Sequence, residues 1–314
     1  MLGATGVFGR LLAERLSTRH RLICAARDHG KLAQLRQSLG VEVRSLDLAR
    51  PAELLDLARR CFAVICAAGP FQRLDRALPS AVAAEGAHWL DIADDPEWIS
   101  AQLETAPRAV AILPGLSTIP ALSGVLARVG LRRASGDRAR VTLFIGNRNA
   151  KGSAAIESAL RSPLDRPVAI DLPFGRYLAG RFSSADELLL GRELGLQVDS
   201  RVAFEMRGGL TLLRWAGRTF GSPRLIRSLA APLGWLGTDR GCIQLELFKK
   251  ERPLLKCAFV GRGQSMAILP VCFALDELAR GARLARSPAE ILPVDAFVAC
   301  LAAEQIELRV GPCR

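Results

Sequence analysis

Several residue types on which common enzyme classes depend are scarce in this sequence. Its single tyrosine is Tyr177 and the residue four positions later is Arg181, so the Tyr-xxx-Lys pair of short-chain dehydrogenases is absent. No serine lies in the G-x-S-x-G pattern of an esterase nucleophile elbow. Only three histidines occur and there is no CxxC pair, so we expect no metal site.

Long apolar runs are also missing. No stretch approaches the roughly 18 consecutive apolar residues that a membrane-spanning helix needs. The first residues, MLGATGVFGR, have neither the basic n-region nor the apolar h-region of a secretory signal. Most of the eight cysteines lie inside apolar runs such as LICAA, where cysteine acts as a small buried hydrophobe. We therefore expect a cytoplasmic protein with thiols rather than disulfides and with no integral membrane segment.

Positive charge is in excess. Of 43 cationic residues five are lysine and 38 are arginine, and the formal net charge is +12. The sequence has neither zinc-finger spacing nor a basic strip interleaved with aromatic residues, so we expect no nucleic-acid partner but acidic or phosphorylated small ligands. One basic and apolar segment, 223–236, would suit a membrane surface. Pro232 interrupts its helical pattern, and a core-facing amphipathic helix is the alternative.

The pattern along the chain divides it into three parts. In residues 1–130 short apolar runs alternate with helical spacing, which indicates βαβ units and a parallel sheet, with strands expected at 21–26, 41–48, 62–68, 88–92 and 109–113. Residues 131–263 indicate an α+β substrate and dimerisation domain with a mixed or antiparallel sheet, with strands expected at 140–145, 202–206, 209–215, 242–248 and 254–260 and helices at 153–161 and 222–236. Residues 264–314 add helices at 267–280 and 294–303.

A glycine-rich turn opens the first helix. Gly3, Gly6 and Gly9 form a GxxGxxG run, and such glycines let the backbone approach a pyrophosphate that also meets the helix N-terminus. Arg27 ends the next strand, where a guanidinium would accept the 2′-phosphate of NADP, whereas an acid there would bind the ribose of NAD. The neighbouring Asp28 is the competing acid. Asp47, at the end of the strand expected at 41–48, would hydrogen-bond adenine or cap its loop.

Two further strand ends carry candidate residues. Ala68-Gly69-Pro70 lies at the end of the strand expected at 62–68. It would lie against the ribose or nicotinamide, because ligands of open parallel sheets bind outside the carboxyl ends of the strands. Asp91, near the end of the strand expected at 88–92, is the first candidate for proton transfer, and His88 is the second. Asp94 or Asp95 would cap the helix that begins at Pro96.

These segments together resemble a known family. GATGVFG, the AAGPF bend, HWLDIADD and GLSTIPALSG are similar to saccharopine dehydrogenase-like NAD(P)-binding oxidoreductases, over roughly residues 1–130. The resemblance implies a Rossmann domain, a mixed-sheet second domain and tail helices that return to the first. The cofactor contacts that it implies are Gly3, Thr5, Gly6, Val7, Phe8, Gly9, Arg27, Ala68, Gly69 and Pro70.

The sequence departs from that family in two ways. Only Met1-Leu2 precede the glycine turn, where the family has a full apolar strand, so we expect a Rossmann-like parallel sheet with its first strand truncated. The second domain has no residue set that matches an amino-acid site, so saccharopine itself is not the expected substrate.

Two functions of different classes follow. The first is an NADP-dependent oxidoreductase that passes hydride between nicotinamide and a small-molecule carbonyl, imine or enoyl group, in a protein that would form a homodimer. The alternative is a non-catalytic NADP-binding sensor or scaffold, which the weak acid–base candidates favour.

Overall fold

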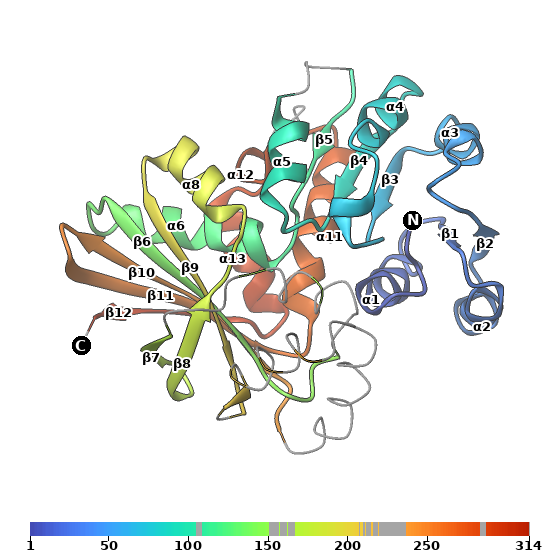
Figure 1. Cartoon of the computed structure of the whole chain (residues 1–314). Coiled ribbons are helices and arrows are strands. Elements are labelled where there is room, and N and C mark those ends of the chain that lie inside the picture. Colours follow the sequence, from blue (N-terminus) through green and yellow to red (C-terminus); the bar gives the residue numbers. More distant parts are fainter. Residues whose placement is uncertain are drawn as a thin grey trace. The chain divides into compact units, whose positions relative to one another are not determined.

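Figure 1 shows the computed structural model of the chain, which describes residues 1–104, 109–150, 167–206, 237–282 and 287–313 and single positions between these ranges. The chain forms two compact units. The first contains Met1–Ser117 and Ala267–Leu292, and the second contains Thr118–Met266 and Pro293–Arg314.

The first unit alternates strands and helices. All of its strand pairs are parallel, which confirms the expected α/β organisation. Its elements in chain order are α1 (Val7–Leu16), β1 (Ile23–Ala26), α2 (His29–Leu39), β2 (Glu42–Ser45), α3 (Ala52–Ala58), β3 (Ala63–Cys66), the short helix η1 (Phe71–Arg73), α4 (Leu78–Ala84), β4 (His88–Asp91), α5 (Pro96–Leu103) and β5 (Ile112–Leu113), joined by α11 (Ser265–Ala279) and α12 (Pro288–Ile291).

Leu2 occupies the centre of this sheet. It forms parallel bridges with Ala25 of β1 on one side and Cys66 of β3 on the other. The Leu2 N–H donates to Ile65 O at 2.8 Å, and Ala67 N donates to Leu2 O at 3.0 Å. The spatial order is therefore β2, β1, Leu2, β3, β4, β5, and the expected Rossmann-like sheet with a short first strand is confirmed.

Short-range signals explain several boundaries in this unit. The Asp28 carboxylate accepts a hydrogen bond from Lys31 N and so caps α2, and Gly40 ends that helix with a left-handed φ of 67°. Asp95 caps α5 through Trp98 N, as the sequence suggested for this position. The strands are shorter than expected, although single backbone hydrogen bonds continue past the ends of β2 and β3, from Leu46 N to Ala26 O and from Ala67 N to Leu2 O.

The second unit contains a seven-stranded mixed sheet. Its strands lie in the order β12, β11, β10, β6, β9, β8, β7, and among the described strands only the β6–β9 pair is parallel. The strands are β6 (Arg138–Ile145), β7 (Val168–Leu172), β8 (Gly175–Arg181), β9 (Gln197–Phe204), β10 (Arg240–Lys249), β11 (Arg252–Arg262) and β12 (Glu307–Pro312). The helices are η2 (Thr118–Leu122), α6 (Ser123–Leu131), α8 (Asp186–Leu194) and α13 (Val294–Ala303). Helix α6 packs on β10 and β11 (Figure 1).

One face of this sheet carries a row of alternating charges that the sequence did not predict. Lys256, Glu246, Arg140 and Asp199 lie on β11, β10, β6 and β9 at paired positions, and Arg201 follows on β9. Consecutive members are 3.3, 3.3, 3.0 and 2.8 Å apart, and each side chain is at most 21% exposed. Direct register thus produces a nearly buried ion-pair ladder across four strands.

Other expectations for this half of the chain have different outcomes. The structure adds β7, β8, α8 and β12, which the sequence pattern missed. Apart from single positions, the strand expected at 209–215 and the helices expected at 153–161 and 222–236, with the candidate membrane segment 223–236, lie outside the described residues. The described positions within 209–215, which are 209, 211 and 215, are helical, so the strand expected there is wrong at these positions. The eight cysteines are present as thiols, as expected. Among the described residues no helix is long and apolar enough to cross a membrane.

Candidate functional site

Backbone atoms pack tightly around two glycines of the glycine turn. Gly3 has a φ of 72°, and a Cβ there would lie 2.7 Å from Ala67 C and from Ala68 N. A Cβ at Gly9 would lie 2.1 Å from Gly3 O. Real Cβ atoms do not approach other backbone this closely. The contact of the turn with the loop after β3 therefore requires glycine at position 3, and the packing of α1 on the turn requires it at position 9.

Gly6 differs from the other two glycines. It is exposed, its φ and ψ of −76° and 171° suit any residue, and the nearest atom to an added Cβ is Gly3 O at 3.2 Å. Within the described residues, no side chain caps α1 and its first turn holds no acid. Carboxylates, by contrast, cap both α2 and α5. The N-terminus of α1 therefore keeps its N–H groups available for an anion beside Gly6.

The carboxyl ends of β1 and β2 carry the next candidates. Arg27 follows β1 directly and is exposed. The Asp28 carboxylate is turned to Lys31, with Lys31 N donating at 3.0 Å and Lys31 Nζ at 3.3 Å. The hydrogen bond from Lys31 N holds the pKa of Asp28 below its ordinary value. Asp47 Oδ1 accepts a hydrogen bond from Ala49 N at 3.2 Å, which is the loop-capping alternative for this residue.

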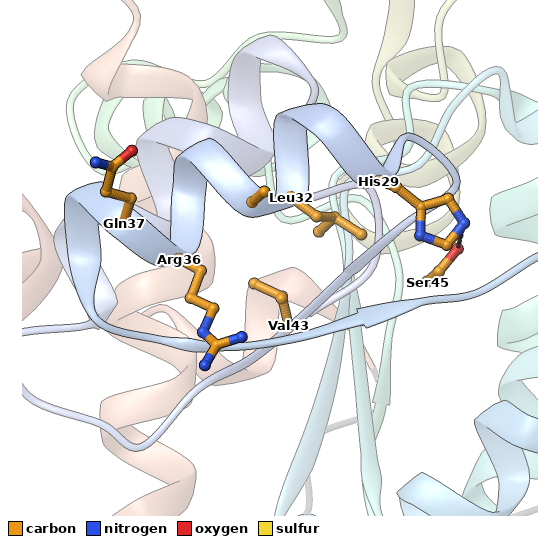
Figure 2. Close-up of a pocket in the computed structure, with 7 residues that line it drawn as sticks. His29, Leu32, Arg36, Gln37, Val43 and Ser45 are labelled. Atoms are coloured by element: carbon orange, nitrogen blue, oxygen red, sulfur yellow. Dashed lines mark hydrogen bonds between the residues drawn. The ribbon is translucent and has the colours of Figure 1, made fainter.

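A groove of about 420 Å³ runs between α2 and β2. His29 and Ser45 lie at its end near the carboxyl edge of the sheet, where His29 Nε2 and Ser45 Oγ are hydrogen bonded at 3.1 Å (Figure 2). Arg36 and Gln37 line its other end. The sequence analysis missed His29 and Ser45, although both lie within two residues of a residue that it had selected.

The loop after β3 holds Ala68, Gly69 and Pro70. It lies against the glycine turn, as the contacts of Gly3 with Ala67 and Ala68 show. Directly before it, Cys66 is wholly buried, and this burial raises the pKa of its thiol to about 12. The structure thus brings the glycine turn and the Ala68–Pro70 loop together.

Asp91 has a different environment from the one expected of a proton donor. Its side chain is 0% exposed, and its two oxygens accept four hydrogen bonds, from the indoles of Trp89 and Trp98 and from Ala93 N and Gly115 N. Burial raises the pKa of Asp91, while these hydrogen bonds oppose the rise. No face of the carboxylate is open to solvent, so the geometry gives no support to proton transfer to a ligand at this residue.

His88 lies at the opposite edge of the sheet. It is the first residue of β4 and Asp91 is the last, and ligands of parallel sheets bind at the carboxyl edge. Its Nδ1 accepts a hydrogen bond from Ala111 N at 2.9 Å, and its ring packs on Phe62 at 4.7 Å. Burial lowers the pKa of His88. The structure therefore does not bring His88 to the candidate site, because strand direction places it at the amino end.

Comparisons with known proteins agree with this geometry. Residues 3–89 match a family model described as NAD(P)H-binding, from the glycine turn into β4. The chain also superposes on apo saccharopine dehydrogenase (L-Glu forming) from Saccharomyces cerevisiae, with a TM-score of 0.62 and 12% identity over 100% of this chain and 99% of the yeast chain. The chain has a saccharopine dehydrogenase-like fold. The segment that matches the NAD(P)H-binding model lies in its first unit.

Other structures superpose on this chain with lower TM-scores. A probable dehydrogenase from Thermotoga maritima has a TM-score of 0.48 and 11% identity, covering 99% of this chain and 97% of that one. A putative myo-inositol dehydrogenase from Sinorhizobium meliloti 1021 has a TM-score of 0.45 and 13% identity, covering 100% and 98%. No curated protein sequence matches the chain.

Proposed function

We propose that the protein is an NADP-dependent oxidoreductase that passes hydride between nicotinamide and a carbonyl, imine or enoyl group of a small molecule. The observation that carries the nucleotide part is Gly6. The fold demands glycine there far less than at Gly3 and Gly9, yet the residue lies at the uncapped N-terminus of α1, where a Cβ would obstruct a pyrophosphate. The match of residues 3–89 to an NAD(P)H-binding model supports the same assignment.

Arg27 supports NADP over NAD. Its guanidinium follows β1, at the position where the adenosine 2′ group lies in this fold, and its fork geometry suits a phosphate. Asp28, the acid that would bind a ribose hydroxyl, is engaged by Lys31. Asp47 accepts one hydrogen bond, from Ala49 N to Oδ1, and its other carboxylate oxygen would serve the adenine.

Calorimetric titration of NADPH and NADH tests this preference. Arg27→Ala should weaken NADPH binding by roughly ten- to hundredfold, since a hydrogen bond to a charged group contributes about 1.5–3 kcal/mol, and it should leave NADH unchanged. Arg36→Ala is the matched control, because this arginine lies on α2 at the far end of the groove, away from the carboxyl end of β1. Equal affinities for the two nucleotides in the wild type would refute the NADP preference.

A non-catalytic sensor or scaffold is the second candidate. The observation that favours it is that Asp91 is enclosed and His88 lies at the amino edge, so neither is placed to move a proton at the ligand. NADPH oxidation measured with a panel of carbonyl, imine and enoyl compounds separates the two functions. Binding of NADPH without oxidation by any member would favour the sensor.

The setting of the protein is also proposed. Thiols in all eight cysteines suit a reducing compartment, and we retain the cytoplasm as the proposed location. A homodimer formed through the second unit, acting on a small molecule and not on nucleic acid, stays a prediction that light scattering and binding assays test.

A further inference from the structure

A wholly buried carboxylate ends β4. Asp91 Oδ2 accepts hydrogen bonds from the indole N–H groups of Trp89 at 2.8 Å and Trp98 at 2.9 Å. Oδ1 accepts from Ala93 N at 3.0 Å and from Gly115 N at 2.9 Å. Each carboxylate oxygen thus accepts two hydrogen bonds, which is about the full number that a carboxylate can accept.

The donors belong to separate segments of the first unit. Ala93 lies in the loop that leaves β4, and Gly115 lies in the loop that leaves β5. The backbone of Asp91 joins the same arrangement, because Leu116 N donates to Asp91 O at 2.7 Å. One residue therefore holds the two loops that follow neighbouring parallel strands.

Trp98 extends this arrangement to a third loop. Its ring packs on Phe71 of η1, with 5.4 Å between the ring centroids. Gln72 Nε2 donates to Asp95 Oδ2 at 2.8 Å, and Asp95 Oδ1 accepts from Trp98 N at 2.8 Å. Helix η1 directly follows Ala68–Pro70, the loop that lies against the glycine turn.

The four donors around Asp91 favour its ionised form. All four groups that face the carboxylate are N–H donors, so a proton on either oxygen would point at an N–H group and break a hydrogen bond. An ionised carboxylate satisfies all four, and charge-assisted bonds of this kind are the stronger ones.

We infer that Asp91 is a positioning residue of the nucleotide site. Its carboxylate holds the loops after β3, β4 and β5 in one arrangement at the carboxyl edge, so that Ala68, Gly69 and Pro70 face the ribose and nicotinamide before the ligand arrives. This inference rests on the proposed nucleotide-binding function and gives Asp91 a role in binding instead of proton transfer.

The test uses the full chain and three variants. In Asp91→Asn an amide N–H replaces one acceptor and faces two donors, so two of the four hydrogen bonds are lost. Trp98→Phe keeps an aromatic ring against Phe71 and removes one donor. Glu97→Gln is the control, because Glu97 lies beside Trp98 on α5 and its carboxylate side chain is 77% exposed.

Dissociation constants for NADPH and NADH are measured by calorimetry, with unfolding followed by circular dichroism. Asp91→Asn should weaken both nucleotides by the same factor, about tenfold or more, and Trp98→Phe by about two- to tenfold, as expected for losing two and one buried hydrogen bonds. Glu97→Gln should bind like the wild type. A purely structural role would lower the melting temperature without changing the affinity of the folded protein.

The indole protons give an independent signature. Of the four tryptophans, Trp89 and Trp98 should show indole N–H resonances shifted downfield by the carboxylate, and both shifts should disappear in Asp91→Asn. Wild-type affinity in a folded Asp91→Asn would overturn the inference, as would lost turnover at unchanged affinity. If Asp91→Asn does not fold, Trp98→Phe decides. A wild type that binds neither nucleotide would refute the proposed function itself.

Discussion

Asp186 predicts an unusual dependence of stability on pH. It is the first residue of α8, wholly buried, and its Oδ1 lies 2.5 Å from Ser123 Oγ. The same hydroxyl oxygen is 2.9 Å from Pro120 O. A hydroxyl has one proton, so if Ser123 donates to Pro120, the proton in the short contact belongs to Asp186. Burial raises the pKa of Asp186 to about 7, from 3.8, which agrees with a neutral acid.

The sign and the size follow from linkage. The folded pKa lies above the unfolded one, so between pH 3.8 and 7 the native state keeps a proton that the unfolded state releases. The contribution of Asp186 to stability is therefore greatest below pH 3.8 and falls by about 1.4 kcal/mol per pH unit through this window, a total loss of about 4 kcal/mol by pH 7. That loss is a large share of the roughly 5–15 kcal/mol of a typical domain.

Asp186→Asn removes the titration while its amide can donate to Ser123 Oγ as the neutral acid does. Urea unfolding of wild type and variant from pH 4 to pH 8 isolates the effect, because all other carboxyl groups cancel in the difference. We expect equal stability near pH 4 and a variant more stable by about 4 kcal/mol near pH 7. Glu187→Gln, a change of the exposed neighbouring acid, should retain the wild-type slope. A variant less stable than the wild type by a constant amount at every pH would show that Asp186 is ionised and accepts from Ser123.

Two further predictions concern the glycine turn and the charged ladder. Gly6→Ala should keep the wild-type melting temperature and bind NADPH at least about tenfold more weakly, whereas Gly9→Ala should lose more than about 3 kcal/mol of stability in denaturant unfolding, because its Cβ would meet Gly3 O. Wild-type stability in Gly9→Ala would contradict the packing described. Glu246→Gln should cost about 2–3 kcal/mol because it leaves Arg140 and Lys256 without their shared partner, while Arg132→Ala, which breaks the exposed pair with Asp295, should cost less than about 1 kcal/mol. Similar losses in the two variants would refute the role assigned to burial.

The parallel unit was predictable because its signals are local. Each apolar run, each glycine and each capping acid lies within a few residues of the element that it begins or ends, as Asp28 and Gly40 do for α2. In the second unit β7 and β8 were missed, since Val168–Leu172 and Gly175–Arg181 alternate weakly and gain their order from pairing: β7 pairs with β8, and β8 pairs with β9. Strand β12 was missed because its short run of mixed residues is ordered by β11.

The candidate site was predictable only in part, for a related reason. A sequence shows that an acid follows a strand, but the donors of Asp91 come from positions two, seven and 24 residues away, and only the fold shows that they surround it. His88 was misplaced because a strand of four residues is long enough to carry its first residue to the opposite edge. A local sequence pattern predicts neither the burial of a side chain nor the edge of the sheet at which a strand residue lies.

The three glycines of the turn show how far a motif can support a function. Gly3 and Gly9 are needed by the backbone alone, since a Cβ at either would overlap neighbouring main-chain atoms whether or not a nucleotide is present. A chain that had lost all nucleotide binding but kept this fold would still need both. Gly6 meets a much weaker demand, because an added Cβ would contact one backbone oxygen, Gly3 O, at 3.2 Å, which a shift of a few tenths of an ångström relieves. The functional content of the motif therefore lies in its middle glycine, and the Gly6→Ala measurement separates a binding site from a turn that only folds like one.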